Sequence, residues 1–247
     1  MLEKIDGFII KTIDYSETHK IVTIFSKKIG KFTAIARGAK KPKSRMAALT
    51  QPFIYGQFFV YLQQGLSTIQ QGEIIQSYRN IREDIVKTAY ASYVSELTDK
   101  LLDDRRPDYY LFDQFRLTFD WISDHNEYEI PVLMYELKLY KKGGFAPVVD
   151  ACVQCGKKNS PYAFSIREGG LLCTQCKAFD PEAVMLSDVL VRLLYIFSTV
   201  GLERVNSISL KAENRTMLRR LLDAYYDEYG GYKLKSKKFL QQIHHLE

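Results

Sequence analysis

The four cysteines of this 247-residue chain form two Cys-X-X-Cys pairs that lie 17 residues apart: Cys152 with Cys155, and Cys173 with Cys176. This is the spacing of a four-cysteine zinc ribbon, in which each pair presents two sulfurs to one ion from a tight turn. Gly156 and Gly169-Gly170 supply the backbone freedom that such turns require. Because four thiolates fill the tetrahedron of Zn²⁺, the sequence predicts one structural zinc ion per chain.

Two other uses of these cysteines are weaker. Two disulfides are disfavoured in a reducing compartment, and a redox-active protein normally needs only one such pair. We expect a reducing compartment because the sequence shows neither a membrane segment nor a signal sequence. The longest apolar run, residues 189–197, contains Arg192, and the N-terminal residues 1–6 carry acids in place of a signal sequence. We therefore expect a cytoplasmic protein with no membrane segment.

The first 80 residues predict a small β-barrel. Alternating, β-branched and aromatic segments recur over residues 8–13, 20–25, 31–36, 53–62 and 67–78. A polar stretch with Gly38 and Pro42 separates the third segment from the fourth and predicts a long loop. Five strands with such a loop suit an OB-fold, although the pattern alone does not distinguish an OB-fold from an SH3-like barrel.

The hydrophobic period changes to three and four residues from residue 81 onward, which indicates helices. Helical patterns cover residues 81–101, 109–122, 130–140, 186–197, 215–229 and 238–246, with Asn214 as a candidate N-cap. The predicted fold is therefore multidomain α+β. It has an OB-fold barrel over residues 1–80 and a helical domain over residues 81–247, which the zinc ribbon over residues 148–180 interrupts.

Basic residues are concentrated in the predicted barrel. Residues 1–80 hold 12 Lys and Arg against 5 Asp and Glu, whereas residues 81–150 hold 9 against 14. No acidic residue lies between Glu17 and Glu73, and nine basic residues do. Such asymmetry attracts polyanions, of which nucleic acid is the commonest, although a solvated basic face is an equally good reading of charge alone. The predicted phosphate-binding residues are those of the long loop: Arg37, Lys40, Lys41, Lys43 and Arg45.

Signatures of common enzyme classes are absent from the sequence, including phosphate loops, Rossmann glycines, zinc-protease helices and nucleophile elbows. Acidic clusters such as Asp103-Asp104 lie among basic residues and are best read as solvated faces. We therefore predict a non-enzymatic protein. Eight aromatic residues of the barrel exceed what a small core must bury, so one or two of them are candidates for stacking on bases. They are Phe8, Phe25, Phe32, Phe53, Tyr55, Phe58, Phe59 and Tyr61.

Two signatures resemble those of one family. Residues 36–45, from Ala36-Arg37-Gly38 to Ser44-Arg45, followed by Gln51-Pro52-Phe53, resemble the N-terminal signature of the RecO family of bacterial recombination mediators. Gly143-Gly144-Phe145-Ala146-Pro147 leads into the first cysteine pair as in the zinc-bearing branch of that family. The resemblance extends over the whole chain in the same order.

The resemblance implies an OB-fold, a helical domain and a zinc ribbon. It also implies binding of single- and double-stranded DNA, annealing of complementary strands, and help in loading recombinase onto DNA coated by single-strand-binding protein. The implied partners are RecR, the acidic tail of single-strand-binding protein and, indirectly, the recombinase. For that tail, basic residues within the acidic segment are candidate contacts: Arg116, Lys138, Lys141 and Lys142.

Three other functions stay open on the residues alone. An RNA-binding translation or ribosome factor could combine an OB-fold with a zinc ribbon. A protein-interaction scaffold could use the basic loop to bind acidic tails, and a nuclease could use the acidic clusters.

Overall fold

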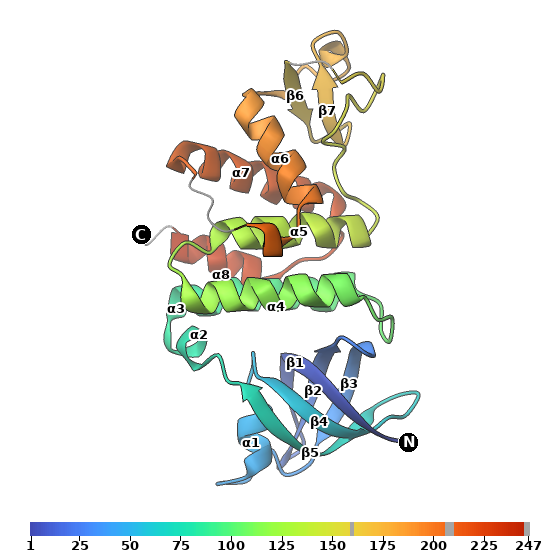
Figure 1. Cartoon of the computed structure of the whole chain (residues 1–247), viewed down its shortest axis with the longest axis vertical. Coiled ribbons are helices and arrows are strands. Elements are labelled where there is room, and N and C mark those ends of the chain that lie inside the picture. Colours follow the sequence, from blue (N-terminus) through green and yellow to red (C-terminus); the bar gives the residue numbers. More distant parts are fainter. Residues whose placement is uncertain (159–160, 206–209, 245–247) are drawn as a thin grey trace. The chain divides into compact units, whose positions relative to one another are not determined.

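The computed structural model describes residues 1–158, 161–205 and 210–244 (Figure 1). The chain forms two compact units. The first comprises Met1–Asn126 with Leu234–Glu247, and the second comprises Glu127–Lys233. Strands give way to helices near residue 80, as the hydrophobic period predicts, but the compact units divide the chain elsewhere. The helices within residues 79–124, and the C-terminal helix, belong to the same unit as the barrel. Whether residues 1–80 form a domain on their own stays a prediction.

The first unit contains a closed five-stranded barrel. Its strands are β1 (Leu2–Tyr15), β2 (His19–Ser26), β3 (Gly30–Ala36), β4 (Tyr55–Tyr61) and β5 (Ser67–Gln76). They close in the order β1-β2-β3-β5-β4, and only β3 and β5 pair in parallel. This connectivity, with the short helix α1 (Arg45–Leu49) between β3 and β4, is that of an OB-fold. Apolar side chains at alternate positions, such as Val22 with Ile24 and Phe32 with Ala34, fill its interior.

Strand β1 is longer than its apolar pattern predicts. Its first half pairs with β4 from Leu2 to Phe8, and its second half pairs with β2 up to Tyr15. A β-bulge between Ile9 and Lys11 lies near the change of partner. Because pairing continues through polar positions at both ends, the hydrophobic pattern marks only the centre of the strand.

Within its described residues, the first unit has four further helices: α2 (Arg79–Glu83), α3 (Ile85–Leu101), α4 (Tyr109–Asp124) and α8 (Lys235–His244). The predicted helix over residues 81–101 is thus broken at Asp84, whose carboxylate accepts hydrogen bonds from the backbone of Val86 and Lys87 and begins α3. Helix α8 packs against α3. Its predicted end at Leu246 lies outside the described residues.

Helix α4 covers a second aromatic layer on the outside of the barrel. The rings of Phe8 and Phe25 contact Phe112 and Phe115 with centroids 5.0–5.9 Å apart. Tyr55 stacks on Phe8 at 4.6 Å, and Phe53 contacts Phe119 of α4. Phe32 and Phe58 lie in the barrel core. The surplus of barrel aromatics is therefore explained chiefly by packing against a helix, which the sequence analysis did not anticipate. Of the eight, only Tyr61 is an exposed side chain.

In the part that the structure describes, the second unit combines three helices with a small sheet. The helices are α5 (Glu129–Lys142), α6 (Asp188–Thr199) and α7 (Ala212–Tyr229). The sheet holds β6 (Tyr162–Ser165), β7 (Gly170–Cys173) and β8 (Val184–Leu186) in the order β7-β6-β8. Two 3-10 helices, Lys177–Phe179 and Leu202–Arg204, complete it. Strand β8 lies beyond residue 180, where the ribbon was predicted to end. The predicted cap at Asn214 is wrong, because α7 already begins at Ala212.

Candidate nucleic-acid interface and candidate metal centre

Residues 37–45, the basic loop, connect β3 to α1. Ala39 within the loop and Leu49 just after it are buried in the barrel core and hold the segment at both sides. Of the five predicted phosphate-binding residues, Arg37 lies just before the first anchor and the other four lie between the anchors. All five are exposed: Arg37, Lys40, Lys41, Lys43 and Arg45.

The backbone of the basic loop is held by local hydrogen bonds. The N–H of Gly38, a residue with φ +70°, donates to Nδ1 of His19 at 3.1 Å. The Ser44 hydroxyl accepts from the N–H of Met46 and begins α1. The backbone N–H of Lys40 donates to the carbonyl of Thr18 at 3.0 Å. The loop therefore presents its cations from a defined backbone, which reduces the entropy lost when a ligand binds.

The basic residues of the barrel fall into two groups by their ion pairs. One group contacts carboxylates. Its pairs are Lys11–Asp99 at 2.9 Å, Lys27–Asp113 at 2.8 Å, Lys28–Glu3 at 2.8 Å, Lys31–Asp99 at 3.6 Å and Lys31–Asp104 at 3.4 Å. In the basic loop, Lys40 pairs with Asp14 at 3.0 Å. Across the described residues, the other four loop cations form no ion pair.

The paired and the unpaired cations lie at different places on the barrel. Helix α1, which directly follows the basic loop, lies at the end of the barrel away from α4 (Figure 1). Lys11, Lys27 and Lys31 instead face α3, α4 and the segment between these helices, where acids neutralise them. The positive charge of the first third of the chain is therefore left uncompensated mainly at the loop, where it can bind an anionic ligand.

The four cysteines converge in the second unit. Their sulfur atoms all lie within 4.8 Å of one another, and all four thiols are free of disulfides. Four sulfurs bound to one zinc ion at about 2.3 Å stand about 3.8 Å apart in a tetrahedron, and the Sγ atoms of Cys155 and Cys173 are 3.8 Å apart. The cluster could therefore hold a metal ion, and the donor set fits a closed, four-sulfur site.

Tight turns set the positions of these sulfurs. The N–H of Gly156, with φ +70°, donates to the carbonyl of Cys152 at 2.8 Å and closes the first turn. The N–H of Cys176 donates to the carbonyl of Cys173 at 3.0 Å and closes the second. Gly170 permits the close approach between the two halves of the ribbon, because a Cβ at this position would lie 2.4 Å from the carbonyl oxygen of Val148.

The cluster also favours a negatively charged sulfur. Burial by itself would raise the pKa of the Cys152 thiol, but hydrogen bonds from the backbone of Cys173, Cys155 and Gln154 lower this pKa to about 6. Burial and hydrogen bonds with the other three thiols raise the pKa of Cys176 to about 12. The thiolate that this lowered pKa favours at Cys152 is the form in which cysteine binds a metal ion.

The four candidate partner-binding residues are not gathered in one place. Arg116 belongs to the first unit and pairs with Asp120 of α4 at 3.4 Å. Lys141 and Lys142 are exposed in the last turn of α5, in the second unit. Lys138 is buried, and its ammonium group donates to the carbonyls of Met134 and Phe197. As an accessible contact for an acidic tail, Lys138 is therefore ruled out: its place on α5 turns it toward α6.

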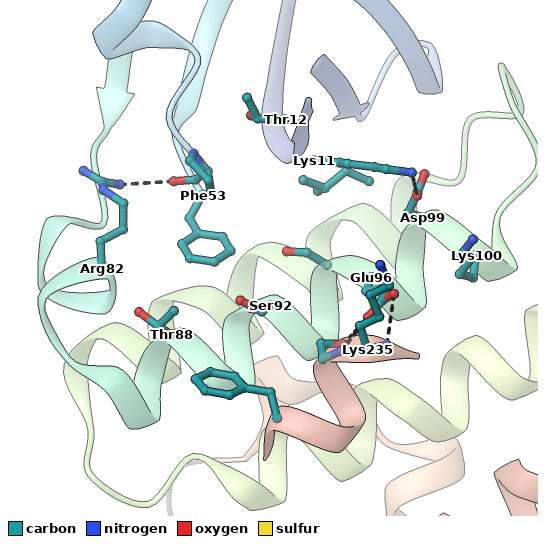
Figure 2. Close-up of a pocket in the computed structure, with 15 residues that line it drawn as sticks. Lys11, Thr12, Phe53, Arg82, Thr88, Ser92, Glu96, Asp99, Lys100 and Lys235 are labelled. Carbon is teal, nitrogen blue, oxygen red and sulfur yellow. Dashed lines mark hydrogen bonds and ion pairs between the residues drawn. The ribbon is translucent and has the colours of Figure 1, made fainter. Parts of the chain in front are cut away.

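The first unit also contains a pocket of about 770 Å³ that no pattern in the sequence predicts. Its wall combines the second half of β1, residues 52 and 53, α3 and the first turn of α8 (Figure 2). These segments lie far apart in the chain and share no motif. The closest signal in the sequence was the Gln51-Pro52-Phe53 segment, which the family resemblance includes but which carries no chemistry by itself.

No helix in the described ranges combines the length and the hydropathy that crossing a membrane requires.

Comparison with known proteins gives a consistent result along the chain. The family model described as Recombination protein O N terminal matches residues 1–78, and the one described as Recombination protein O C terminal matches residues 82–238. The DNA repair protein RecO of Oceanobacillus iheyensis is 62% identical over 243 residues, which cover 98% of this chain and 94% of the relative. The proteins of that name from Bacillus pumilus and Halalkalibacterium halodurans are each 41% identical, over 100% and 98% of this chain and 96% of each relative. With an OB-fold barrel, a helical part and a four-cysteine ribbon in the order that the two signatures indicate, the chain belongs to the RecO family.

Proposed function

We propose that this chain is a non-enzymatic DNA-binding mediator of recombination and DNA repair. It binds single- and double-stranded DNA, anneals complementary strands, and helps to load recombinase onto DNA coated by single-strand-binding protein. Membership of the RecO family, whose curated relatives are named DNA repair proteins, supports the role in repair and recombination.

The observation that carries the DNA-binding part is the uncompensated charge of the basic loop. Four of its cations have no carboxylate partner in the described part of the chain, whereas most cations elsewhere on the barrel do. Lysine and arginine side chains on a loop bind phosphates without reading bases. Annealing needs two negatively charged strands of any sequence to approach each other, and a basic platform lowers their repulsion.

An annealing assay tests this proposal directly. Two complementary oligonucleotides are mixed with the full chain, with and without single-strand-binding protein, and duplex formation is followed by fluorescence energy transfer. We expect faster annealing at low salt in both cases and a loss of the effect as salt screens the loop. An unchanged annealing rate at low salt would contradict the proposal.

A binding comparison separates DNA from the alternative ligand, RNA. The full chain is titrated with a single-stranded DNA and with an RNA of matched length and sequence. A DNA-repair mediator is expected to bind the DNA at least as tightly as the RNA. Clear preference for RNA would favour the translation-factor alternative.

Zinc is the metal that best fits the four-sulfur cluster, and we propose one structural ion per chain. Cys152, Cys155, Cys173 and Cys176 would hold it, and with no open position the ion would stabilise the ribbon without taking part in a reaction. Elemental analysis is expected to find one zinc per chain in protein purified without chelators. Replacement of Cys152 by Ser is expected to remove most of that zinc and to destabilise the second unit, because the free energy of metal binding is also folding free energy here.

The proposed protein partners are RecR, the tail of single-strand-binding protein and, indirectly, the recombinase. For the tail, Lys141 and Lys142 remain candidate contacts in the second unit, and the basic loop is the competing site. If the tail binds at Lys141 and Lys142, a tail peptide is expected to stay bound when DNA saturates the basic loop. The double variant Lys141→Glu/Lys142→Glu is then expected to bind the peptide more weakly. If DNA displaces the peptide fully and the double variant binds the peptide as tightly as the wild type does, the peptide binds at the basic loop instead.

A further inference from the structure

The pocket of the first unit has polar groups that its own fold leaves unused. The hydroxyl oxygen of Ser95, on the α3 wall, is buried and has no hydrogen-bond partner within the part of the chain that the structure describes. A buried hydroxyl without a partner is unfavourable by about 1–3 kcal/mol. Such a group in the wall of a pocket indicates a ligand that completes its hydrogen bonds.

The charged groups of the pocket favour an anionic ligand. Both of its carboxylates are already engaged. Glu96 accepts from the backbone N–H and the hydroxyl of Ser236, at 2.8 and 2.5 Å, and so caps the start of α8. Asp99 pairs with Lys11 at 2.9 Å and also with Lys31. These contacts are drawn in part in Figure 2.

Two cations of the pocket lack carboxylate partners in the described ranges. The guanidinium group of Arg82 donates to the carbonyls of Pro52 and Ser77, and Lys235 is exposed in the first turn of α8. The two come from opposite ends of the pocket, because Arg82 precedes α3 whereas Lys235 packs beside Glu96 (Figure 2). An anion in this pocket therefore meets a cation without a carboxylate partner in the described ranges at either end, and Lys235 is the more accessible of the two.

An aromatic ring in the wall favours a planar ligand. Phe239 of α8 is partly exposed there, whereas the ring of Phe53, directed toward Thr88 and Ser92 of α3, is buried and closes the wall (Figure 2). Stacking of a base on an aromatic side chain contributes about 1–3 kcal/mol and tolerates any base. A pocket of about 770 Å³ has the size of those that bind ligands of nucleotide dimensions.

We propose that this pocket binds a single nucleotide unit, with its base against the ring of Phe239 and its phosphate at Lys235. The inference rests on the proposed DNA binding in one respect, which is that a bound strand would supply the nucleotide. Strand β1 carries Lys11 at the pocket and Asp14 beside Lys40 of the basic loop, three residues or about 10 Å along the strand. A short run of nucleotides can therefore reach from the loop to the pocket.

The test uses the full chain and two probes. Binding of dAMP is measured by calorimetry, and binding of a single-stranded oligonucleotide with one 2-aminopurine is measured by fluorescence, which falls when the base stacks. Ser95→Ala is expected to weaken dAMP binding about three- to tenfold while leaving the melting temperature unchanged or higher, because it removes an unpaired buried hydroxyl. Lys235→Glu is expected to weaken dAMP binding about tenfold, whereas the matched control Lys238→Glu, on the same helix but outside the pocket, changes it less than twofold.

Two results would refute the nucleotide site. If dAMP does not bind, or binds equally well to Ser95→Ala and Lys235→Glu, the nucleotide site is refuted. The nucleotide site is also refuted if nucleotides do not bind, while an acidic peptide binds and both Ser95→Ala and Lys235→Glu weaken its binding. Neither result touches the proposed function, which depends on the salt dependence of DNA binding through the basic loop. Conversely, if dAMP and the oligonucleotide both depend on Ser95 but loop variants do not alter DNA binding, the loop assignment fails and the pocket stands.

Discussion

Lys138 shows how much the surroundings of one residue decide its role. It lies in the acidic segment of the sequence, yet its ammonium group is buried and donates to the carbonyl of Phe197 at 3.0 Å. That carbonyl belongs to the last turn of α6, where helices leave carbonyls without an intrahelical partner. Burial lowers the pKa of Lys138 from 10.5 to about 8, and Glu203 only partly opposes this effect. The residue is thus a structural cap.

The lowered pKa predicts how stability changes with pH. Between about pH 8 and 10.5, the unfolded chain keeps the proton on Lys138 while the folded chain has lost it. The unfolded state then binds more protons, so this residue's contribution to stability rises with pH by up to about 3 kcal/mol. Urea unfolding of the wild type and of Lys138→Met at pH 7.5 and pH 10.5 checks this. The wild type is expected to gain stability relative to the variant at the higher pH, and an unchanged difference would contradict the prediction.

Gly170 gives a second prediction at the scale of a residue. A Cβ at this position would meet the backbone of Val148 at 2.4 Å, and that backbone accepts from Leu171 at 2.8 Å. Gly170→Ala is therefore expected to destabilise the second unit by about 1–3 kcal/mol, as overpacking does, and to lower its metal content. Gly65→Ala, where a Cβ meets nothing within 4 Å, is the matched control. Denaturant unfolding and zinc analysis of both variants would show whether only the first has an effect.

At the scale of elements, the barrel core holds the basic loop at Ala39 and, just after the loop, at Leu49. Ala39 and Leu49 are packed in the core, so exchange of the exposed cations between them removes charge without removing packing. The loop can therefore be tested by substitution without unfolding the barrel.

The salt dependence of DNA binding measures how many phosphates the basic loop neutralises. If Lys40, Lys41, Lys43 and Arg45 neutralise about four phosphates of a single strand, the slope of log K against log salt is near −3. The quadruple Ala variant is expected to flatten this slope and to weaken binding equally for strands of different sequence. Because Lys40 also pairs with Asp14, its share is expected to be the smallest of the four. Equal slopes for the variant and the wild type would remove the loop from the DNA interface.

Strand β8 extends the ribbon beyond residue 180, where the sequence predicts that it ends. Strand β8 pairs with β6 from Val184 to Leu186 and adds a third strand to the hairpin that carries Cys173. The four-cysteine cluster is thus tied to a sheet as well as to two turns, and removal of the proposed zinc ion is expected to loosen that sheet too.

For the molecule as a whole, the question is where the barrel ends as a folding unit. Phe8, Phe25, Phe53 and Tyr55 pack on α4 through ring contacts, and Lys31 pairs with the carboxylates of Asp99 and Asp104. Cutting the chain after residue 80 would expose these rings to water, and each buried phenyl ring is worth about 1.5–3 kcal/mol.

We therefore expect a fragment of residues 1–80 to unfold at lower denaturant than a fragment of residues 1–126, which keeps α4. Urea unfolding followed by circular dichroism compares the two, with the full chain as reference. Equal midpoints for the two fragments would show that residues 1–80 are an independent domain, as the change of hydrophobic period at residue 81 predicts.

Several features follow from the sequence by itself because neighbouring residues encode them. The two Cys-X-X-Cys pairs, with glycines that permit tight turns, predict a cluster of four sulfurs, and the structure brings these sulfurs within 4.8 Å of one another. Alternation of apolar residues predicts the strands of the barrel, and periods of three and four predict α4 and α5. The lack of acids between Glu17 and Glu73 marks the basic segment before any fold is known.

Only the tertiary structure decides which of these residues are available. Lys31 and Arg45 look alike in the sequence, but the first lies against two carboxylates of distant segments and the second is exposed. The same holds for Phe8, which a helix covers, for Lys138, which α6 buries, and for Ser95, whose pocket is assembled from β1, α3 and α8. Hydrophobic period and local turns depend on residues a few positions apart, whereas burial and ion pairing depend on partners that only the folded chain brings together.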